Sequence, residues 1–208
     1  MTILQGSLLD LADGIEVRSL GTSVERTSLS RGAWVDRRPG WVGGADELFE
    51  ALRRDVPWYA ERRQMYDSIV DVPRLLRFYG EGEPLPHLAL EECRQALSAH
   101  YAAELGEPFV TAGMCLYRDG QDSVAWHGDR IGRRRDQDTM VAILAVGSPR
   151  DLLLRPREGG PSQRIASGHG DLVVMGGSCQ RTWDHCVPKT AKPVGPRISV
   201  QFRVRGVR

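Results

Sequence analysis

After Pro108 the sequence breaks into short runs of β-forming residues separated by turn residues. The eight runs cover 109–117, 123–127, 139–146, 151–155, 163–166, 171–175, 180–186 and 197–204. Gly, Pro, Asp or Ser stands between one run and the next. Many short strands at this spacing are typical of a sandwich or a jelly roll. We therefore expect a mainly β protein of the α+β class, whose core is a double-stranded β-helix (jelly roll).

The first half of the chain contains two helical patterns that would flank this core. Residues 45–56 place apolar side chains at helical spacing, and Asp46 could cap that helix. Residues 88–105 carry an apolar stripe and are followed by Gly106, which predicts a second amphipathic helix lying on the outside of a sheet. The stripe consists of Leu90, Cys93, Leu97 and Tyr101.

The remaining N-terminal segments read as loops and extended pieces. Residues 31–41 predict a loop with one short strand, and residues 72–79 predict an extended segment that ends in the Gly/Glu/Pro-rich loop 80–86. A chain of 208 residues is long enough for one domain with a substantial core. We divide it into an N-terminal extension, residues 1–107, and a jelly-roll core, residues 108–208, within one compact domain.

Cysteine usage and hydropathy bear on where the protein works. The four cysteines are scattered without a C-x-x-C pair, which argues against a disulfide framework and suits a reduced cytoplasm. No apolar run approaches the roughly 20 residues of a membrane span, and the N-terminus does not resemble a signal peptide. We expect a cytoplasmic protein, without a membrane partner, that acts as a monomer.

A His-x-Asp pair and a distant histidine carry the chemistry. On an extended strand, side chains two residues apart point to the same side, so His127 and Asp129 would project together. His185 could complete a set of two imidazoles and one carboxylate. Such a set holds ferrous iron on one face and leaves other coordination positions open for a co-substrate and O2.

The chain offers a second copy of the same tripeptide, His169-Gly-Asp171, which must be weighed against the first. His169 lies in a glycine-rich turn only 16 residues before His185, which leaves room for little more than a neighbouring strand. His127 precedes His185 by several predicted strands, so a sandwich could bring the two together from different strands. We therefore favour His127 and Asp129 as ligands, and a turn for the second copy.

The last predicted strand alternates strictly between apolar and polar residues. Ile198, Val200, Phe202 and Val204 occupy the even positions, and Arg197, Ser199, Gln201, Arg203 and Arg205 the odd ones. The polar side would ordinarily face solvent; alternatively, it lines a cavity. In the second case Arg197 and Arg203, with Cα atoms about 20 Å apart on a straight strand, could lean inward and hold the two ends of a dicarboxylate.

Together these residues resemble the AlkB family of 2-oxoglutarate- and Fe(II)-dependent dioxygenases, which repair alkylated nucleic acids. The similarity rests on His127-x-Asp129, His185, the closing segment 196–203, and Met114 to Tyr117 followed by Gly120. It covers roughly residues 72–203, and its parts agree in order and spacing. The resemblance implies a jelly-roll enzyme that uses Fe(II), 2-oxoglutarate and O2.

The resemblance also implies a role for each matching residue. His127, Asp129 and His185 would bind iron, and Arg197 would form a salt bridge with the distal carboxylate of 2-oxoglutarate. Tyr117 would hydrogen-bond the same co-substrate, and Arg203 would lie at the metal end and orient Asp129. The implied reaction converts 2-oxoglutarate to succinate and hydroxylates an N-methyl group of 1-methyladenine or 3-methylcytosine in DNA. The hydroxymethyl product then releases formaldehyde.

Three positions depart from the family pattern. Cys115 and Ser199 stand in the co-substrate region where many members carry asparagines, and Ile131 stands where DNA-repair members often place an acid. These departures leave the oxidation chemistry in place and bear on the substrate. The chemistry could act on RNA, a protein side chain or a small molecule instead.

Several residues are candidates for contacts with a flipped-out base or its phosphates. Trp126 and Trp183 could stack on the base, although we favour packing as the role of each. Met65 and Tyr66 could act as an apolar wedge, or they could form the rim of the sandwich. The arginines Arg130, Arg133, Arg134 and Arg135 could grip phosphates, or they could form a solvated loop.

Two alternative interpretations assign the same residues to a different class of protein. A jelly-roll binding module with structural His and Arg residues would bind no iron and produce no succinate. A zinc site built from His185 with Cys179 and Cys186 is disfavoured, because the adjacent residues 185 and 186 point to opposite faces of a strand.

Overall fold

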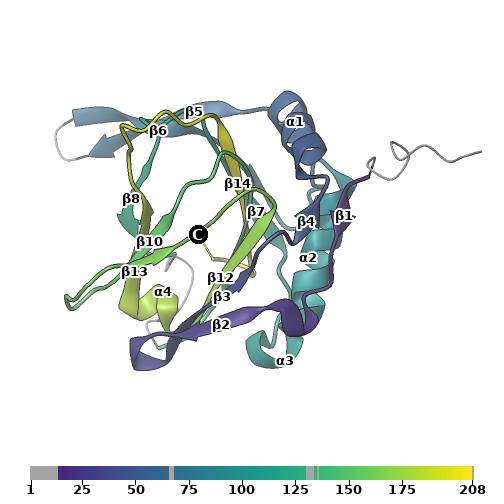
Figure 1. The fold of residues 1–208 in the computed structure, drawn as a ribbon. Helices are drawn as coiled ribbons and strands as arrows, with labels where there is room; N and C mark the ends of the chain where they lie inside the picture. The colour runs from purple at the N-terminus through teal and green to yellow at the C-terminus, as the bar shows by residue number, and fades with distance from the viewer. Residues whose placement is uncertain (1–13, 66–67, 130–133, 135, 208) are drawn as a thin grey trace, which may run out of the picture.

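The structure is a computed structural model that describes residues 14–65, 68–129, 134 and 136–207, without the side chains of residues 63–70 (Figure 1). Two antiparallel sheets face each other, and helices cover the outer face of the larger one. The predicted jelly-roll architecture is confirmed. Within the described part of the chain, no helix is long and apolar enough to cross a membrane.

The larger sheet has eight strands in the order β2-β3-β12-β9-β14-β7-β6-β5. Their bounds are Glu25–Ser28, Ala33–Arg38, Asp171–Gly177, Val141–Gly147, Arg197–Arg203, Thr111–Tyr117, Ser68–Tyr79 and Tyr59–Met65 in that order. The smaller sheet has the order β11-β10-β13-β8, with bounds Gln163–Ile165, Leu152–Pro156, Trp183–Val187 and Val124–His127. β1 (Glu16–Val17) and β4 (Val42–Gly43) form a separate pair. The larger sheet thus contains strands from both sides of residue 107.

The two main helices form as the apolar spacing predicts. α1 (Ala45–Asp55) buries Leu48, Phe49 and Leu52, while its N-cap is Gly44 in the left-handed region, with φ of 61°. Asp46 therefore lies in the first turn and does not cap the helix. A Cβ on Gly44 would lie 2.7 Å from the Gly14 carbonyl oxygen, so only glycine fits this N-cap.

The second predicted helix is divided at Tyr101. α2 (Leu88–His100) is capped by the His87 side chain, which accepts a hydrogen bond from the Ala89 amide, and α3 (Ala102–Leu105) ends before Gly106. The predicted stripe of α2 is fully buried. The Tyr101 hydroxyl donates to Asp36 at 2.9 Å, which anchors the break between the helices to β3.

Two apolar clusters separate the three layers. The first lies between the helices and the larger sheet and joins α1 and α2 side chains to alternate residues of β7, β9, β12 and β14. The second lies between the two sheets and contains Val35, Ile143, Leu154, Met175 and Trp183 among others. Both faces of the larger sheet are therefore covered, which explains why strands such as β9 are almost entirely buried.

Two segments differ from the sequence-based expectation. Residues 31–41 were expected to be mainly loop, but β3 is a full strand between β2 and β12. The predicted strand 180–186 begins only at Trp183, because residues Cys179–Thr182 form the short helix α4. Arginines and a buried aspartate obscure the first pattern, and a four-residue helix is too short to show periodicity.

Candidate metal and co-substrate site

Three side chains meet between the sheets at the end of β8. His127 is the last residue of β8 and pairs with His185 of β13, so both imidazoles leave the smaller sheet on the same side. Their ring centroids are 4.2 Å apart. Asp129 follows in the loop, and the potential ligand atoms of the three residues all lie within 4.8 Å of one another. Within the described residues, no other His, Cys, Asp or Glu group comes close enough to hold a metal ion.

The His127 ring is oriented by its own strand. Its Nδ1 lies 2.9 Å from the Ala125 carbonyl oxygen, which can only accept, so Nδ1 carries the proton. In the neutral imidazole this leaves Nε2 as the nitrogen with a free lone pair, and Nε2 lies 3.9 Å from Oδ1 of Asp129. A histidine whose one nitrogen donates to a carbonyl presents the other nitrogen as a metal ligand.

His185 is buried, with 5% of its surface exposed. Burial is the main reason that the pKa of His185 falls to about 3, and the neighbouring His127 lowers it further. The imidazole is therefore neutral at physiological pH. A metal would not need to displace a proton from a neutral imidazole to use its lone pair.

Asp129 is held from two sides. Its Oδ2 accepts hydrogen bonds from Nε and Nη2 of Arg203 at 3.1 and 3.0 Å, and its amide donates to Oε1 of Gln180 at 3.0 Å. Burial by itself would raise the pKa of Asp129, but the charge of Arg203 and the two imidazoles outweigh it, and the pKa lies below its usual range. The carboxylate is therefore ionised, with Oδ1 turned toward His127.

The glycine of His127-Gly-Asp129 leaves no room for a side chain. A Cβ on Gly128 would lie 2.3 Å from Nη2 of Arg157 and 3.0 Å from the Gln180 carbonyl oxygen. The loop therefore packs directly against α4 and the Arg157 side chain, just after β10, which fixes the direction in which Asp129 leaves it.

The second His-Gly-Asp copy forms a tight turn, as expected. Nδ1 of His169 accepts from the Gly147 amide at 2.8 Å, and Gly170 has a φ of 77°. Asp171 accepts from the Gly168 and Gly40 amides, both at 2.8 Å. These contacts tie the turn to the chain around it and leave the copy no part in the metal cluster.

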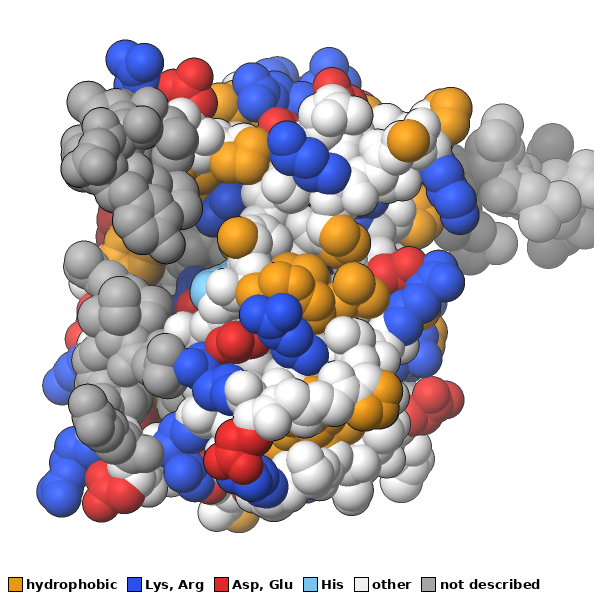
Figure 2. Space-filling model, turned by 90° about the vertical axis from the view of Figure 1, so that its left-hand side faces the viewer, with side chains coloured by type: hydrophobic (Ala, Val, Ile, Leu, Met, Phe, Trp, Pro, Cys, Tyr) orange, Lys and Arg blue, Asp and Glu red, His pale blue; other side chains and the backbone are white. Residues whose placement is uncertain are grey.

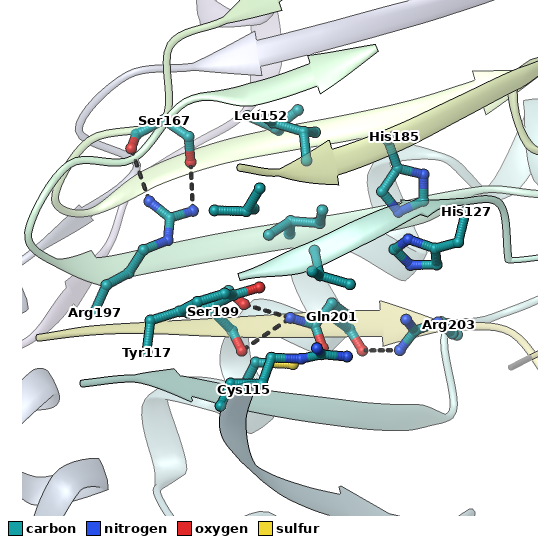
Figure 3. Close-up of a pocket in the computed structure, with 15 residues that line it drawn as sticks. Cys115, Tyr117, His127, Leu152, Ser167, His185, Arg197, Ser199, Gln201 and Arg203 are labelled. Carbon is teal, nitrogen blue, oxygen red and sulfur yellow. Dashed lines mark hydrogen bonds between the residues drawn. The ribbon is translucent and has the colours of Figure 1, made fainter. Parts of the chain in front are cut away.

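A pocket of about 550 Å³, including its mouth, extends from the metal cluster between the sheets (Figure 3). The polar side of β14 lines it, while Ile198, Val200 and Phe202 face the helices. The cavity interpretation of the alternating strand is therefore correct. Arg205 follows β14, is exposed and pairs with Glu81, so it has no part in the pocket.

Arg197 lies at the end of the pocket away from the histidines (Figure 3). Its Nη1 donates to the carbonyl oxygens of Ser167 and Arg150 at 2.9 and 3.3 Å, and Nη2 donates to the Ser167 hydroxyl at 3.0 Å. Its buried Nε has no hydrogen-bond partner, and among the described residues no carboxylate forms an ion pair with it. Burial lowers the pKa of Arg197 to about 10. A buried guanidinium without a counter-charge fits the carboxylate of a small acid.

The other predicted co-substrate residues line the same pocket. Tyr117 pairs in register with Arg197, and Cys115 pairs with Ser199. Burial raises the pKa of Tyr117, so its phenol is protonated and can donate. Arg203 lies at the metal end of the pocket, where it hydrogen-bonds Asp129, as the family resemblance implied.

Sequence reasoning missed four polar residues of the site. Ser167 fixes Arg197, Gln180 fixes the Asp129 amide, and Arg74 and Gln201 line the pocket. Gln201 had a detectable signal, since it belongs to the polar side of the alternating strand. The other three reach the site from the loop before β12, from α4 and from β6, so no spacing in the sequence links them to it.

The residues that were predicted to contact a base or its phosphates lie in different environments. Trp183 is 4% exposed and packs in the cluster between the sheets, as the packing interpretation of this residue expects. Trp126 is partly exposed, and the guanidinium carbon of Arg155 lies 4.3 Å from its ring centroid. Arg134 is exposed and lies 3.4 Å from Asp136. The side chains of Met65, Tyr66, Arg130, Ile131, Arg133 and Arg135 lie outside those that the structure describes.

Comparisons with known proteins agree with this geometry. The family model of the 2OG-Fe(II) oxygenase superfamily matches residues 44–203. The bovine alpha-ketoglutarate-dependent dioxygenase alkB homolog 3 is 33% identical over 204 residues, covering 87% of this chain and 68% of its own. The human DNA oxidative demethylase ALKBH2 is 27% identical over 182 residues, covering 76% and 68%.

Solved structures show the same fold at low sequence identity. "The structure of OsALKBH1" has a TM-score of 0.61 and 12% identity, covering 87% of this chain and all of that one. A Trichoplax adhaerens prolyl hydroxylase in complex with a hypoxia inducible factor peptide fragment has a TM-score of 0.60 and 12% identity, with 84% of both chains covered.

The jelly roll and its His-Asp-His cluster define a 2-oxoglutarate- and Fe(II)-dependent oxygenase. Within that superfamily, the chain belongs to the AlkB family of dioxygenases. Its cofactors are therefore Fe(II), 2-oxoglutarate and O2. The donor set fits Fe(II), which takes two imidazoles and one carboxylate on one face in enzymes of this type.

Proposed function

We propose that this protein oxidatively demethylates N-alkylated bases in DNA, of the 1-methyladenine and 3-methylcytosine type, and releases formaldehyde and succinate. The observation that carries the proposal is the buried His-Asp-His cluster at one end of a pocket whose other end is an unpaired guanidinium. The names of the relatives supply the substrate class, since they include a DNA oxidative demethylase.

In this proposal His127, Asp129 and His185 hold Fe(II), and Arg197 with Tyr117 holds 2-oxoglutarate. The bound iron and co-substrate supply an oxidant that hydroxylates the N-methyl group. The protein keeps Asp129 ionised and aimed through Arg203, and it keeps His185 neutral. It also surrounds the co-substrate with Leu152, Val173 and Val187, which limit the access of water to that end of the pocket.

The mouth of the pocket suits a nucleotide lifted out of its stack. Figure 2 shows Lys and Arg side chains, with Asp and Glu side chains among them, spread over one face of the molecule, with hydrophobic side chains gathered in its middle and a His visible beside them. Trp126 is next to His127 in β8, and adjacent strand residues point to opposite faces, so its partly exposed ring and Arg155 beside it lie on the outer face of the smaller sheet and do not line the pocket. Lifting a base out costs a few kcal/mol, which contacts from arginines to phosphates would offset in part.

The β5–β6 hairpin forms one end of the larger sheet, and Figure 1 shows it on the same side of the molecule as β8, the strand of His127. Tyr59 is 46% exposed, and Arg62 pairs with Asp71 across the two strands. We propose that this hairpin contacts the strand that carries the flipped base. The site is assembled within one chain, so we propose that a monomer suffices.

The test is demethylation of defined oligonucleotides by the iron-loaded protein with 2-oxoglutarate in air. Single-stranded DNA and RNA of the same sequence, each with one 1-methyladenine or 3-methylcytosine, are analysed by mass spectrometry while formaldehyde and succinate are measured. We expect loss of 14 mass units from DNA, about one formaldehyde per base repaired, and no reaction with Asp129→Asn. The matched control is Asp138→Asn, an exposed aspartate outside the cluster.

Two results would contradict the proposal. Demethylation of RNA with none of DNA would move the substrate to RNA. Succinate production that no methylated oligonucleotide stimulates would leave the oxygenase chemistry intact and point to a protein or small-molecule substrate.

A further inference from the structure

Four polar side chains of neighbouring strands form a connected row along the floor of the pocket. The Cys115 thiol lies 3.8 Å from Oε1 of Gln201, and Nε2 of Gln201 lies 2.5 Å from the Ser199 hydroxyl and 3.0 Å from the Ser199 carbonyl oxygen (Figure 3). Tyr117 and Ser199 line the same floor, and a contact from the Ser199 side chain opposes the rise in the pKa of Tyr117 that burial causes. The row therefore runs from β7 to β14 and back, and ends beside Arg197.

The chemistry of these groups fixes the direction of each hydrogen bond. The Ser199 carbonyl oxygen can only accept, so the amide nitrogen of Gln201, which only donates, must face it. The amide oxygen then faces Cys115, whose thiol is the donor of that pair. This assignment follows from the hydrogen-bond network, which is how amide orientations are decided.

The same reasoning applies to the two hydroxyl groups. The Ser199 oxygen accepts from Gln201, so its single proton is available for the phenol oxygen of Tyr117. With its oxygen engaged as an acceptor, the Tyr117 phenol has its own proton to donate. When Ser199 donates this proton to the phenol, all donors in the row point one way, toward the end of the pocket where Arg197 would bind a carboxylate.

The backbone makes room for this row. Gly113 of β7 stands opposite Gln201 in the register of the sheet. A Cβ at Gly113 would lie 3.1 Å from Oε1 of Gln201 and 2.8 Å from Nη1 of Arg203. The missing side chain allows both long polar side chains to lie flat along the floor. Gln201 itself is 9% exposed, so its amide has little water to bond instead.

We propose that Gln201 is a positioning residue for 2-oxoglutarate, which acts through Ser199 to hold the Tyr117 phenol as a hydrogen-bond donor to the co-substrate. Cys115 and Ser199 stand where many family members carry asparagines, and neither supplies an amide. In this chain the amide comes from Gln201, two residues further along β14. The inference rests on 2-oxoglutarate binding, which family membership supplies, and is independent of the proposed DNA substrate.

The experiment measures 2-oxoglutarate binding directly, without nucleic acid. Calorimetric titrations use protein loaded with Mn(II) under anaerobic conditions, so no turnover occurs. We expect Gln201→Leu to weaken 2-oxoglutarate binding about tenfold, as loss of one hydrogen bond to a charged group would, with Mn(II) affinity unchanged. The matched control, Gln163→Leu, alters an exposed glutamine of β11 and should bind as the wild type does.

A double-mutant cycle separates this role from simple packing. If Gln201 acts through Tyr117, Gln201→Leu should have almost no effect on 2-oxoglutarate affinity once Tyr117→Phe has removed the phenol proton. Additive effects of the two substitutions on 2-oxoglutarate affinity would overturn the proposal. It would also be overturned if the Gln201→Leu variant bound 2-oxoglutarate with an affinity within twofold of the wild type.

A second substitution covers the case in which Gln201→Leu does not fold. Ser199→Ala removes the hydroxyl link but leaves the Ser199 carbonyl as a partner for Gln201. The relay predicts the same tenfold loss of 2-oxoglutarate affinity and the same lack of additivity with Tyr117→Phe. Unchanged affinity in Ser199→Ala would refute the relay without any measurement on Gln201.

Discussion

Arg197 gives the sharpest prediction, because 2-oxoglutarate binding should depend on it while the stability of the fold should not. Replacing it with methionine removes the guanidinium but keeps a long side chain in the same space. We expect Arg197→Met to abolish 2-oxoglutarate binding, and yet to leave the ligand-free protein about as stable as the wild type.

The expected change in the free energy of unfolding follows from the groups that surround Arg197. Burial lowers the pKa of Arg197 from 12.5 to about 10, a cost of about 3 kcal/mol for holding the charge there. Against this stand its three hydrogen bonds to Ser167 and Arg150, worth about 1 kcal/mol each. The two effects nearly cancel, so the free energy of unfolding should change by less than about 2 kcal/mol. For a chain of this size that is a melting-temperature change of less than roughly 8 °C.

Thermal unfolding of metal-loaded protein with and without 2-oxoglutarate provides the assay, again with Mn(II) and without O2. At 100 times its dissociation constant, 2-oxoglutarate should stabilise the wild type by about 2.7 kcal/mol and Arg197→Met not at all. The control is Arg205→Met, an exposed arginine just beyond β14, which should keep the full ligand effect. A ligand-free Arg197→Met protein destabilised by 4 kcal/mol or so, or one still stabilised by 2-oxoglutarate, would refute the reasoning.

Three further predictions concern the metal loop, pH and DNA. Gln180→Leu removes the acceptor of the Asp129 amide and should weaken Co(II) binding about tenfold; unchanged affinity would show that α4 does not hold the loop. Because the folded state resists protonating His185, the metal-free protein should lose stability to urea as pH falls from 6.5 toward 3, and His185→Leu should flatten that slope. Alanine at Arg133 to Arg135 should weaken DNA binding and lower the slope of log K against log salt by up to about 2, and an unchanged slope would exclude phosphate contacts there.

The two His-Gly-Asp copies show what the sequence could decide. The choice of the first copy rested on the number of strands that separate each histidine from His185, and the structure places His127 and His185 on paired strands. The tripeptides themselves are identical, and their difference lies in what surrounds them. Gly170 adopts a positive φ within a turn, whereas Gly128 is needed because Arg157 and Gln180 approach it closely. Contacts of that kind depend on residues distant in sequence and leave no local pattern.

The closing strand shows how an alternating pattern can be ambiguous. A strand with one apolar and one polar side ordinarily lies at a surface. Here the apolar side packs on α1 and α2, and the polar side faces the smaller sheet across the pocket. The ambiguity could be resolved only by knowing that a third layer exists. The same layering makes Trp183 a core residue, although its neighbours in the sequence are polar.

The two ends of the pocket are held by different kinds of partner, which separates metal binding from co-substrate binding. Arg203 bonds Asp129, so its position depends on the metal cluster. Arg197 bonds the carbonyls of Arg150 and Ser167. These two residues lie in the β9–β10 and β11–β12 loops, and neither contacts a ligand of the cluster through any hydrogen bond of the described residues. The hydrogen bonds that orient Arg197 therefore involve no metal ligand, because backbone carbonyls of the jelly roll, rather than a counter-charge, fix its guanidinium.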